Sequence, residues 1–406
     1  MKPKIKLFSD IPINAIIIPI LLIFLLQVFI SMFYNNNNLT FYSIHSFDSL
    51  TKADTMANSN WTDPGRNIPG LKEINGFLYP FIVSLLIKLF GKYNVIPVLY
   101  VISFFVFLLI SIIFYKIAYY FFGGNYSKLT TVVFIITAPV MLSVFSGADV
   151  ILIDLLFALN VYYIYFYAPA KDYKMSIIIS IILLFTNYAG IIYGLSSLFY
   201  IALSMNEKKI KDNYVRNVLI LISCFVLFCI IFCGFIFIEK ITPSFIEQNV
   251  LKENKTFYVH SFFKDGFLWS KLIPPFLSIF FFISLFMRYS NEIREKKISF
   301  MTYALLVSIA AFIIEFFAVF SIKTDTVLFI APFFFLFTLL SMDGIFYFAD
   351  LIQRKNSIFT KNNLILGLIL FVILYNIIWS FTLTIEKNND IRQQHGNVYV
   401  EKFFEK

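Results

Sequence analysis

The feature that most constrains this chain is a series of long apolar runs. Residues 11–33, 217–238, 299–321 and 363–385 each contain few or no charged side chains. A helix of about twenty residues is long enough to cross the ~30 Å hydrocarbon core of a bilayer. The whole chain is 59% hydrophobic and 14% charged, whereas soluble domains are about 45–50% apolar. The sequence therefore excludes a soluble protein and predicts an all-α polytopic membrane protein.

Reading the runs in chain order predicts about eleven transmembrane helices. The expected spans are 11–33, 95–115, 129–146, 149–168, 175–187, 189–204, 217–238, 273–287, 299–321, 326–349 and 363–385. The stretch 77–91 is apolar over only about a dozen positions and contains Pro80 and Lys88, so it predicts a helix that lies along the membrane interface. The stretch 175–204 is too long for one span. A polar break around Thr186 predicts a hairpin of two short helices there.

The distribution of basic residues predicts the orientation. More than half of the 33 Lys and Arg residues lie in the segments 1–10, 116–128, 169–174, 205–216, 288–298 and 353–362. Basic loops remain on the cytoplasmic side of a membrane, so we expect a cytoplasmic N-terminus and an external C-terminus in a bacterial plasma (inner) membrane. We expect one transmembrane domain, 1–406, with a first external loop 34–94 that contains the interfacial helix 77–91, a second external loop 239–272, and a short external tail 386–406.

The net charge of +9 does not indicate nucleic-acid binding, because the basic residues form short clusters between apolar runs, where they meet anionic lipid headgroups. We therefore expect membrane lipids, and no nucleic acid, as partners. Cys224, Cys229 and Cys233 lie in one apolar span without a His or an acid at ligand spacing. They are expected to be packing residues that form neither a disulfide nor a metal site.

The first external loop contains most of the side chains that can do chemistry. They are His45, Asp48, Asp54, Asp63, Arg66, Lys72 and Glu73. A carboxylate in such a group can deprotonate an acceptor hydroxyl, and a cation can balance the charge of a phosphate leaving group. The alternative is a solvated loop whose charges only keep it in water.

The order of several motifs resembles a known superfamily. A single span is followed by a long loop with an early Asp, then FLYPFIVSLLIKLFG, then a span that ends in YKIAYYFFGG. Further along come Ala138-Pro139, SGADVILIDLLFALNVYYIYFY from Ser146, the hairpin at 175–204, and APFFFLF from Ala331. This pattern is similar to the GT-C superfamily of polyprenyl-phosphate-sugar-dependent glycosyltransferases. The nearest groups are the protein O-mannosyltransferase-like enzymes (glycosyltransferase family 39-like) and the lipid A aminoarabinose transferases.

The resemblance implies roles for particular carboxylates. Asp48 in HSFDSL is the best counterpart of the family's catalytic Asp, which implies a general base for the acceptor, and Asp54 is its rival. Asp149 in SGADV matches a second acidic residue that would orient the acceptor or a cation. Asp149 can equally serve only as a cap of the following helix, where an acid is favourable.

The resemblance also implies contacts to the lipid phosphate. Lys72 or Glu73 in GLKEINGFLYP occupies the family's position for this contact, and Arg66 lies nearby. The family's His-Pro-Pro or Lys-Pro-Pro is absent, and only Pro80 remains. The Arg-Tyr pair that precedes the family's late proline-containing span is also absent, so the phosphate contact there falls to Lys323.

The sequence thus favours a membrane glycosyltransferase, which would transfer a sugar from a polyprenyl-phosphate donor to a lipid, glycan or protein acceptor outside the cytoplasm. A divalent cation would bind if Asp48, Asp149 and Glu73 converge. One alternative is a polytopic transporter or flippase of lipid-linked glycans. It would need charged groups along its path, and we expect only Glu315 and Asp154 within the spans. A glycan polymerase or ligase is the other alternative. Such an enzyme would be expected to have arginines in a large late external loop, and loop 239–272 has none.

Overall fold

The structure is a computed structural model of the 406-residue chain. It describes residues 12–34, 44–58, 78–137, 140, 150–207, 214–240, 275–321, 330–355 and 360–393. These residues form thirteen α-helices and one short 3-10 helix, and no strand occurs among them. The prediction of an all-α protein is confirmed.

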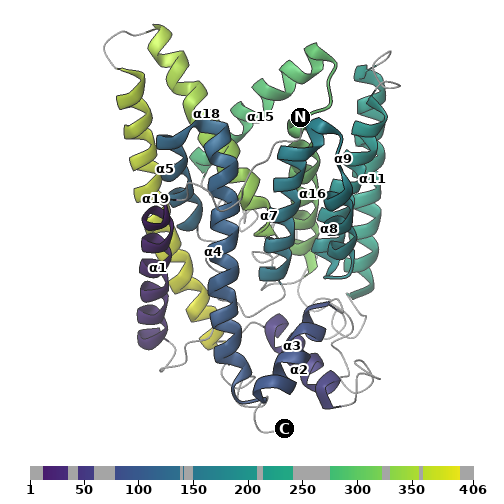
Figure 1. The fold of residues 1–406 in the computed structure, drawn as a ribbon, viewed down its shortest axis with the longest axis vertical. Helices are drawn as coiled ribbons and strands as arrows, with labels where there is room; N and C mark the ends of the chain where they lie inside the picture. Colours follow the sequence, from purple (N-terminus) through teal and green to yellow (C-terminus); the bar gives the residue numbers. More distant parts are fainter. Residues whose placement is uncertain are drawn as a thin grey trace, which may run out of the picture. The chain divides into compact units, whose positions relative to one another are not determined.

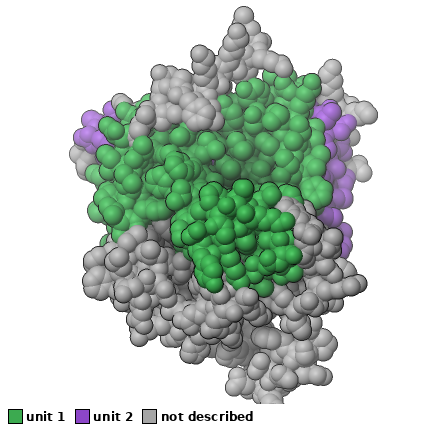
Figure 2. Space-filling model, turned by 60° about the horizontal axis from the view of Figure 1, so that its bottom comes forward, with its two compact units in different colours: residues 1–195, 367–406 green, residues 196–366 purple. Residues whose placement is uncertain are grey.

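The chain divides into two compact units, which Figure 2 distinguishes by colour. Unit 1 comprises residues 1–195 and 367–406, and unit 2 comprises residues 196–366. The boundaries between them fall inside two continuous helices, α9 (Tyr188–Met205) and α19 (Lys361–Gln393).

The other helices belong to one unit each. In unit 1 they are α1 (Ile13–Tyr34), α2 (Ile44–Asn58), α3 (Leu78–Phe90), α4 (Val95–Phe122), α5 (Gly124–Ile135), α7 (Val150–Tyr167), the 3-10 helix η1 (Ala168–Ala170) and α8 (Lys174–Leu184). In unit 2 they are α11 (Tyr214–Lys240), α15 (Pro275–Glu295), α16 (Phe300–Ser321) and α18 (Phe333–Lys355).

Several of these helices have the length and apolarity of membrane spans. Four described helices qualify by both criteria: Val95–Phe122, Val150–Ala170, Phe333–Arg354 and Asn362–Ser380. Shorter apolar helices cover Ile16–Leu25, Leu78–Phe90, Tyr126–Ile135, Lys174–Leu184, Ala189–Met205, Asn217–Ile231 and Phe300–Ile314. The chain is therefore an integral multi-pass membrane protein.

Helices α2 and α3 lie together at the end of α4 where that helix begins (Figure 1). One face of α2 is apolar because Leu50, Ala53 and Met56 recur at helical spacing, and all three are buried. Helix α3 ends at Phe90, and the next residue, Gly91, has a φ of 83° in the left-handed region that favours glycine. The chain then turns within a few residues and enters α4 at Val95.

Helices α15 and α18 approach each other closely in unit 2. A Cβ atom added to Gly344 of α18 would lie 1.9 Å from the Phe280 carbonyl oxygen of α15, so only a glycine fits there. One turn earlier on α18, the Ser341 hydroxyl donates a hydrogen bond to the Leu277 carbonyl at 3.1 Å. Small residues and interhelical hydrogen bonds of this kind hold helices together in lipid, where the hydrophobic effect contributes little.

Candidate functional site

Two carboxylates of the predicted first external loop, those of Asp48 and Asp54, lie on helix α2. Asp48 lies in the first half of this helix, and its backbone alone is within the part of the chain that the structure describes. Asp54 lies six residues further along the same helix, with its side chain described. The predicted base and its rival therefore share one short helix that packs against α3.

Asp54 is held by two side chains. Its Oδ2 atom lies 3.0 Å from the ammonium of Lys92, which occupies the turn between α3 and α4. Its Oδ1 atom accepts a hydrogen bond of 3.2 Å from the Asn58 amide, one turn along α2. The Asp54 and Lys92 side chains are only 18% and 19% exposed, so this ion pair is better shielded from water than a usual surface pair.

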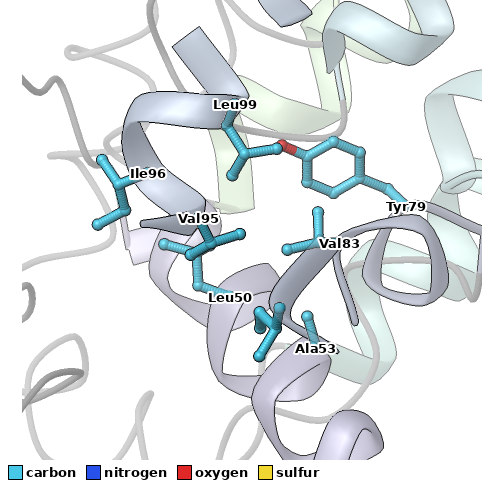
Figure 3. Packing of buried hydrophobic residues seen from close by; sticks show 8 residues of the cluster. Leu50, Ala53, Tyr79, Val83, Val95, Ile96 and Leu99 are labelled. Carbon is cyan, nitrogen blue, oxygen red and sulfur yellow. The ribbon is translucent and has the colours of Figure 1, made fainter. Parts of the chain in front are cut away.

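A hydrophobic cluster packs α2 against its neighbouring helices. Its members come from α2, α3 and α4 (Figure 3) and are Leu50, Ala53, Tyr79, Val83, Ile87, Val95, Ile96 and Leu99. Leu152 of α7 packs against the same cluster. Leu50 is two residues from Asp48 on α2, and Leu152 lies in the first turn of α7, so the cluster joins the part of α2 that carries Asp48 to the start of α7.

The start of α3 is also tied to the turn between α8 and α9. The Leu78 backbone N–H donates a hydrogen bond to the Phe185 carbonyl at 3.3 Å. Within that turn, the Asn187 side chain accepts a hydrogen bond of 3.0 Å from the Gly190 N–H and so caps α9. The polar break that predicted a hairpin is thus the cap of its second helix. The contact brings together two segments that the basic-residue pattern assigns to the external side.

Five predicted site residues lie outside the described part of the chain. They are Asp149, Arg66, Lys72, Glu73 and Lys323. Within the described ranges, no three His, Cys, Asp or Glu side chains are close enough together to hold a metal ion. The three carboxyl groups that would form the cation site, those of Asp48, Asp149 and Glu73, are not among the described side chains.

The sequence analysis did not predict the buried carboxylate of Asp343 in unit 2. Asp343 lies within the expected span 326–349, and its side chain is 6% exposed. The Arg288 guanidinium donates two hydrogen bonds of 2.6 Å to its oxygens, and the Ser284 hydroxyl donates a third. The spans therefore contain an acid besides the expected Glu315 and Asp154. Asp343 could have been noticed in the run SMDGIF, but its partner is far away in sequence.

A second buried acid, Glu292, lies near the C-terminal end of α15, beyond the apolar part of that helix. Glu292 accepts hydrogen bonds from the Met301 N–H at 3.1 Å and the Thr302 hydroxyl at 2.8 Å, and so caps the start of α16. Burial raises the pKa of Glu292 to about 7, although these hydrogen bonds lower it. Burial also raises the pKa of Tyr214, and the neighbouring Glu292 raises it further.

Among known proteins, the chain is similar in fold to one solved structure. No protein-family model matches the sequence, and no curated protein is found to be similar to it. Among solved structures, the chain is similar to ArnT from Cupriavidus metallidurans, crystallised in the apo state. The TM-score is 0.43, the identity is 12%, and the alignment covers 93% of this chain and 75% of that one.

Proposed function

We propose that this protein is a membrane glycosyltransferase of the GT-C type, which transfers a sugar from a polyprenyl-phosphate carrier to a lipid, glycan or protein acceptor outside the cytoplasm. The motifs from Asp48 to the stretch after Ser146 support the proposal. The packing of helix α2, which carries Asp48, supports it further.

The main observation is that α2 and α7 share one hydrophobic cluster. Leu50 of α2 is part of this cluster and Leu152 of α7 packs against it. Asp48 is two residues from Leu50 on α2, and in the sequence Asp149 directly precedes α7, which begins at Val150. In this proposal Asp48 activates the acceptor and Asp149 orients it.

In the proposed reaction, the acceptor hydroxyl oxygen attacks the anomeric carbon of the donor sugar. Asp48 takes the hydroxyl proton as the new C–O bond forms, and the bond between the anomeric carbon and the phosphate oxygen breaks. The polyprenyl phosphate leaves with its electron pair, and Arg66, Lys72 or Lys323 balances its charge. Glu73, beside Lys72, would orient that cation, and Asp149 would orient the acceptor.

The test measures sugar transfer in membranes that contain the full chain. The assay supplies a radiolabelled undecaprenyl-phosphate sugar and follows label in lipid, glycan and protein fractions. Asp48→Asn should reduce transfer by about 10²–10⁴-fold, the usual contribution of a general base, while the amount of inserted protein stays unchanged. Asp172→Asn, at an acid predicted to be cytoplasmic, is the matched control and should keep full activity.

Full activity of Asp48→Asn would remove Asp48 from the mechanism. Movement of the labelled donor across the membrane without transfer of its sugar would overturn the glycosyltransferase proposal in favour of a flippase. Adding EDTA to the same assay tests the divalent cation separately, because a required cation would be lost to the chelator.

A further inference from the structure

We infer that Asp54 and Lys92 form a positioning pair, which fixes helix α2 on its support and thereby fixes where Asp48 lies. This inference rests on the proposed function only in the role given to Asp48. It assigns Asp54 a task other than that of the general base, although its position in the loop makes it the rival of Asp48 for that role.

The contacts of Asp54 leave it poorly suited to act as a base. One of its oxygens faces the Lys92 ammonium at 3.0 Å, and the other accepts from the Asn58 amide at 3.2 Å. A general base must direct a lone pair at the proton that it removes. Both Asp54 oxygens are instead directed at groups of the protein, one in α2 and one in the turn that follows α3.

The ion pair gives α2 a directional contact, which its apolar face does not provide. Leu50, Ala53 and Met56 bury that face, but contacts between apolar side chains are non-directional, and Ala53 is too small to interlock deeply. A carboxylate paired with an ammonium fixes both distance and direction. Because Lys92 follows the Gly91 turn between α3 and α4, the pair ties α2 to the two helices that form its support.

The register of α2 determines the position of Asp48. Asp48 and Asp54 are six residues apart on one helix, about 9 Å along its axis at 1.5 Å per residue. Any rotation or slide of α2 at Asp54 is transmitted rigidly to Asp48. Misplacing a reacting group by about 1 Å can cost about 10²-fold in rate, so a pair that holds α2 in register affects catalysis without touching the substrate.

The first test reads the position of residue 48 without any activity assay. In the full chain with Cys224, Cys229 and Cys233 replaced by serine, Asp48→Cys is labelled with a membrane-impermeant maleimide in membrane vesicles. Asp54→Asn or Lys92→Met should change the labelling rate about two- to fivefold, as expected for the coupling of one ion pair. The charge swap Asp54→Lys with Lys92→Asp should restore the original rate. Lys128→Met, at an exposed lysine of α5, is the matched control and should leave the rate unchanged.

The second test uses the transfer assay on the same variants with Asp48 intact. Each single variant should lower kcat by up to about 10²-fold with little change in KM, and the charge swap should recover most of the loss. A lysine at position 54 cannot act as a carboxylate base, so an inactive swap would show that Asp54 itself does the chemistry and would overturn the inference. If a single variant does not insert, the neutral pair Asp54→Asn with Lys92→Gln is measured in its place under the same criteria.

The two tests separate this inference from the proposed function. The positioning role would be overturned if Asp54→Asn and Lys92→Met left the labelling rate unchanged, or if the charge swap did not restore it. This holds whether or not the variants transfer sugar. Absence of transfer in the unaltered protein, together with the expected labelling pattern, would overturn the glycosyltransferase proposal and leave the structural role of the pair in place.

Discussion

Arg288 of α15 donates two hydrogen bonds to the carboxylate of Asp343 of α18, from its Nε and Nη2 atoms, each 2.6 Å long. The Asp343 side chain is almost completely buried, whereas 36% of the Arg288 side chain is exposed. The arginine therefore remains partly hydrated while it neutralises an acid inside the helix pair. A buried acid with this arrangement is a structural group and gives no support to a charged transport path.

Removing only the cation should leave a buried, uncompensated carboxylate. We expect Arg288→Met to lower the free energy of unfolding by about 2–3 kcal/mol, below the about 3–5 kcal/mol of a fully buried pair because Arg288 is partly exposed. The double variant Arg288→Met with Asp343→Leu should be more stable than Arg288→Met alone, since no charge is then buried. Unfolding of the purified protein in nanodiscs measures both. Asp343→Leu alone completes the comparison. If the double variant lost as much stability as the two single variants added together, this coupling would be contradicted.

The close approach of α15 and α18 predicts a steric effect at Gly344. A Cβ atom at this position meets the Phe280 carbonyl at 1.9 Å, so Gly344→Ala must push the two helix backbones apart. We expect a loss of about 1–3 kcal/mol, the usual cost of overpacking, seen as a lower thermal unfolding midpoint.

Gly367 of α19 provides the matched control for Gly344. A Cβ atom added there meets nothing within 4 Å. Because alanine is favoured over glycine in helices by about 0.5–1 kcal/mol, Gly367→Ala should be neutral or slightly stabilising. Equal effects of the two substitutions would show that helix propensity, and not the contact with Phe280, decides the result.

These contacts show which parts of the structure could be predicted from the sequence. Helix positions follow from the length of apolar runs, which is a local property. The short run 77–91 thus predicts α3, which the structure places at Leu78–Phe90. The contacts of Gly344 with Phe280 and of Asp54 with Lys92 join residues far apart in sequence. Apolar patterns predict that a helix is buried but do not specify which partner buries it, so these pairs required the three-dimensional structure.

Glu292 predicts a pH dependence of stability. Its pKa is raised to about 7 from an ordinary value of 4.5, so the folded protein keeps this proton between those pH values while the unfolded chain releases it. Its contribution to stability is fully present below pH 4.5 and is lost as the pH rises through 7. The loss should be about 3 kcal/mol at most, at 1.36 kcal/mol per pKa unit.

The comparison with Glu292→Gln isolates this effect. Glutamine has nearly the same shape and cannot ionise, so the unfolding midpoint of the variant should fall less than that of the unaltered protein between pH 5 and 8. Other titrating groups are present in both proteins and cancel in the difference. Parallel midpoint curves across this range would show that Glu292 does not govern the pH dependence.

The predicted orientation can be tested at two exposed positions of unit 1. Tyr93, in the turn between α3 and α4, is 73% exposed, and Lys171, just after η1, is also exposed. In a chain without native cysteines, Tyr93→Cys should react with an impermeant maleimide in intact cells, and Lys171→Cys only after the cells are permeabilised. The rings of Tyr120 and Phe166, whose centroids are 5.1 Å apart near the ends of α4 and α7, are typical of an aromatic belt at the membrane interface.

The physical reason for the expected labelling is that the basic residues around Lys171 remain in the cytoplasm. The reverse labelling would place Asp48 and Lys72 in the cytoplasm, and the proposed external transfer would then be wrong.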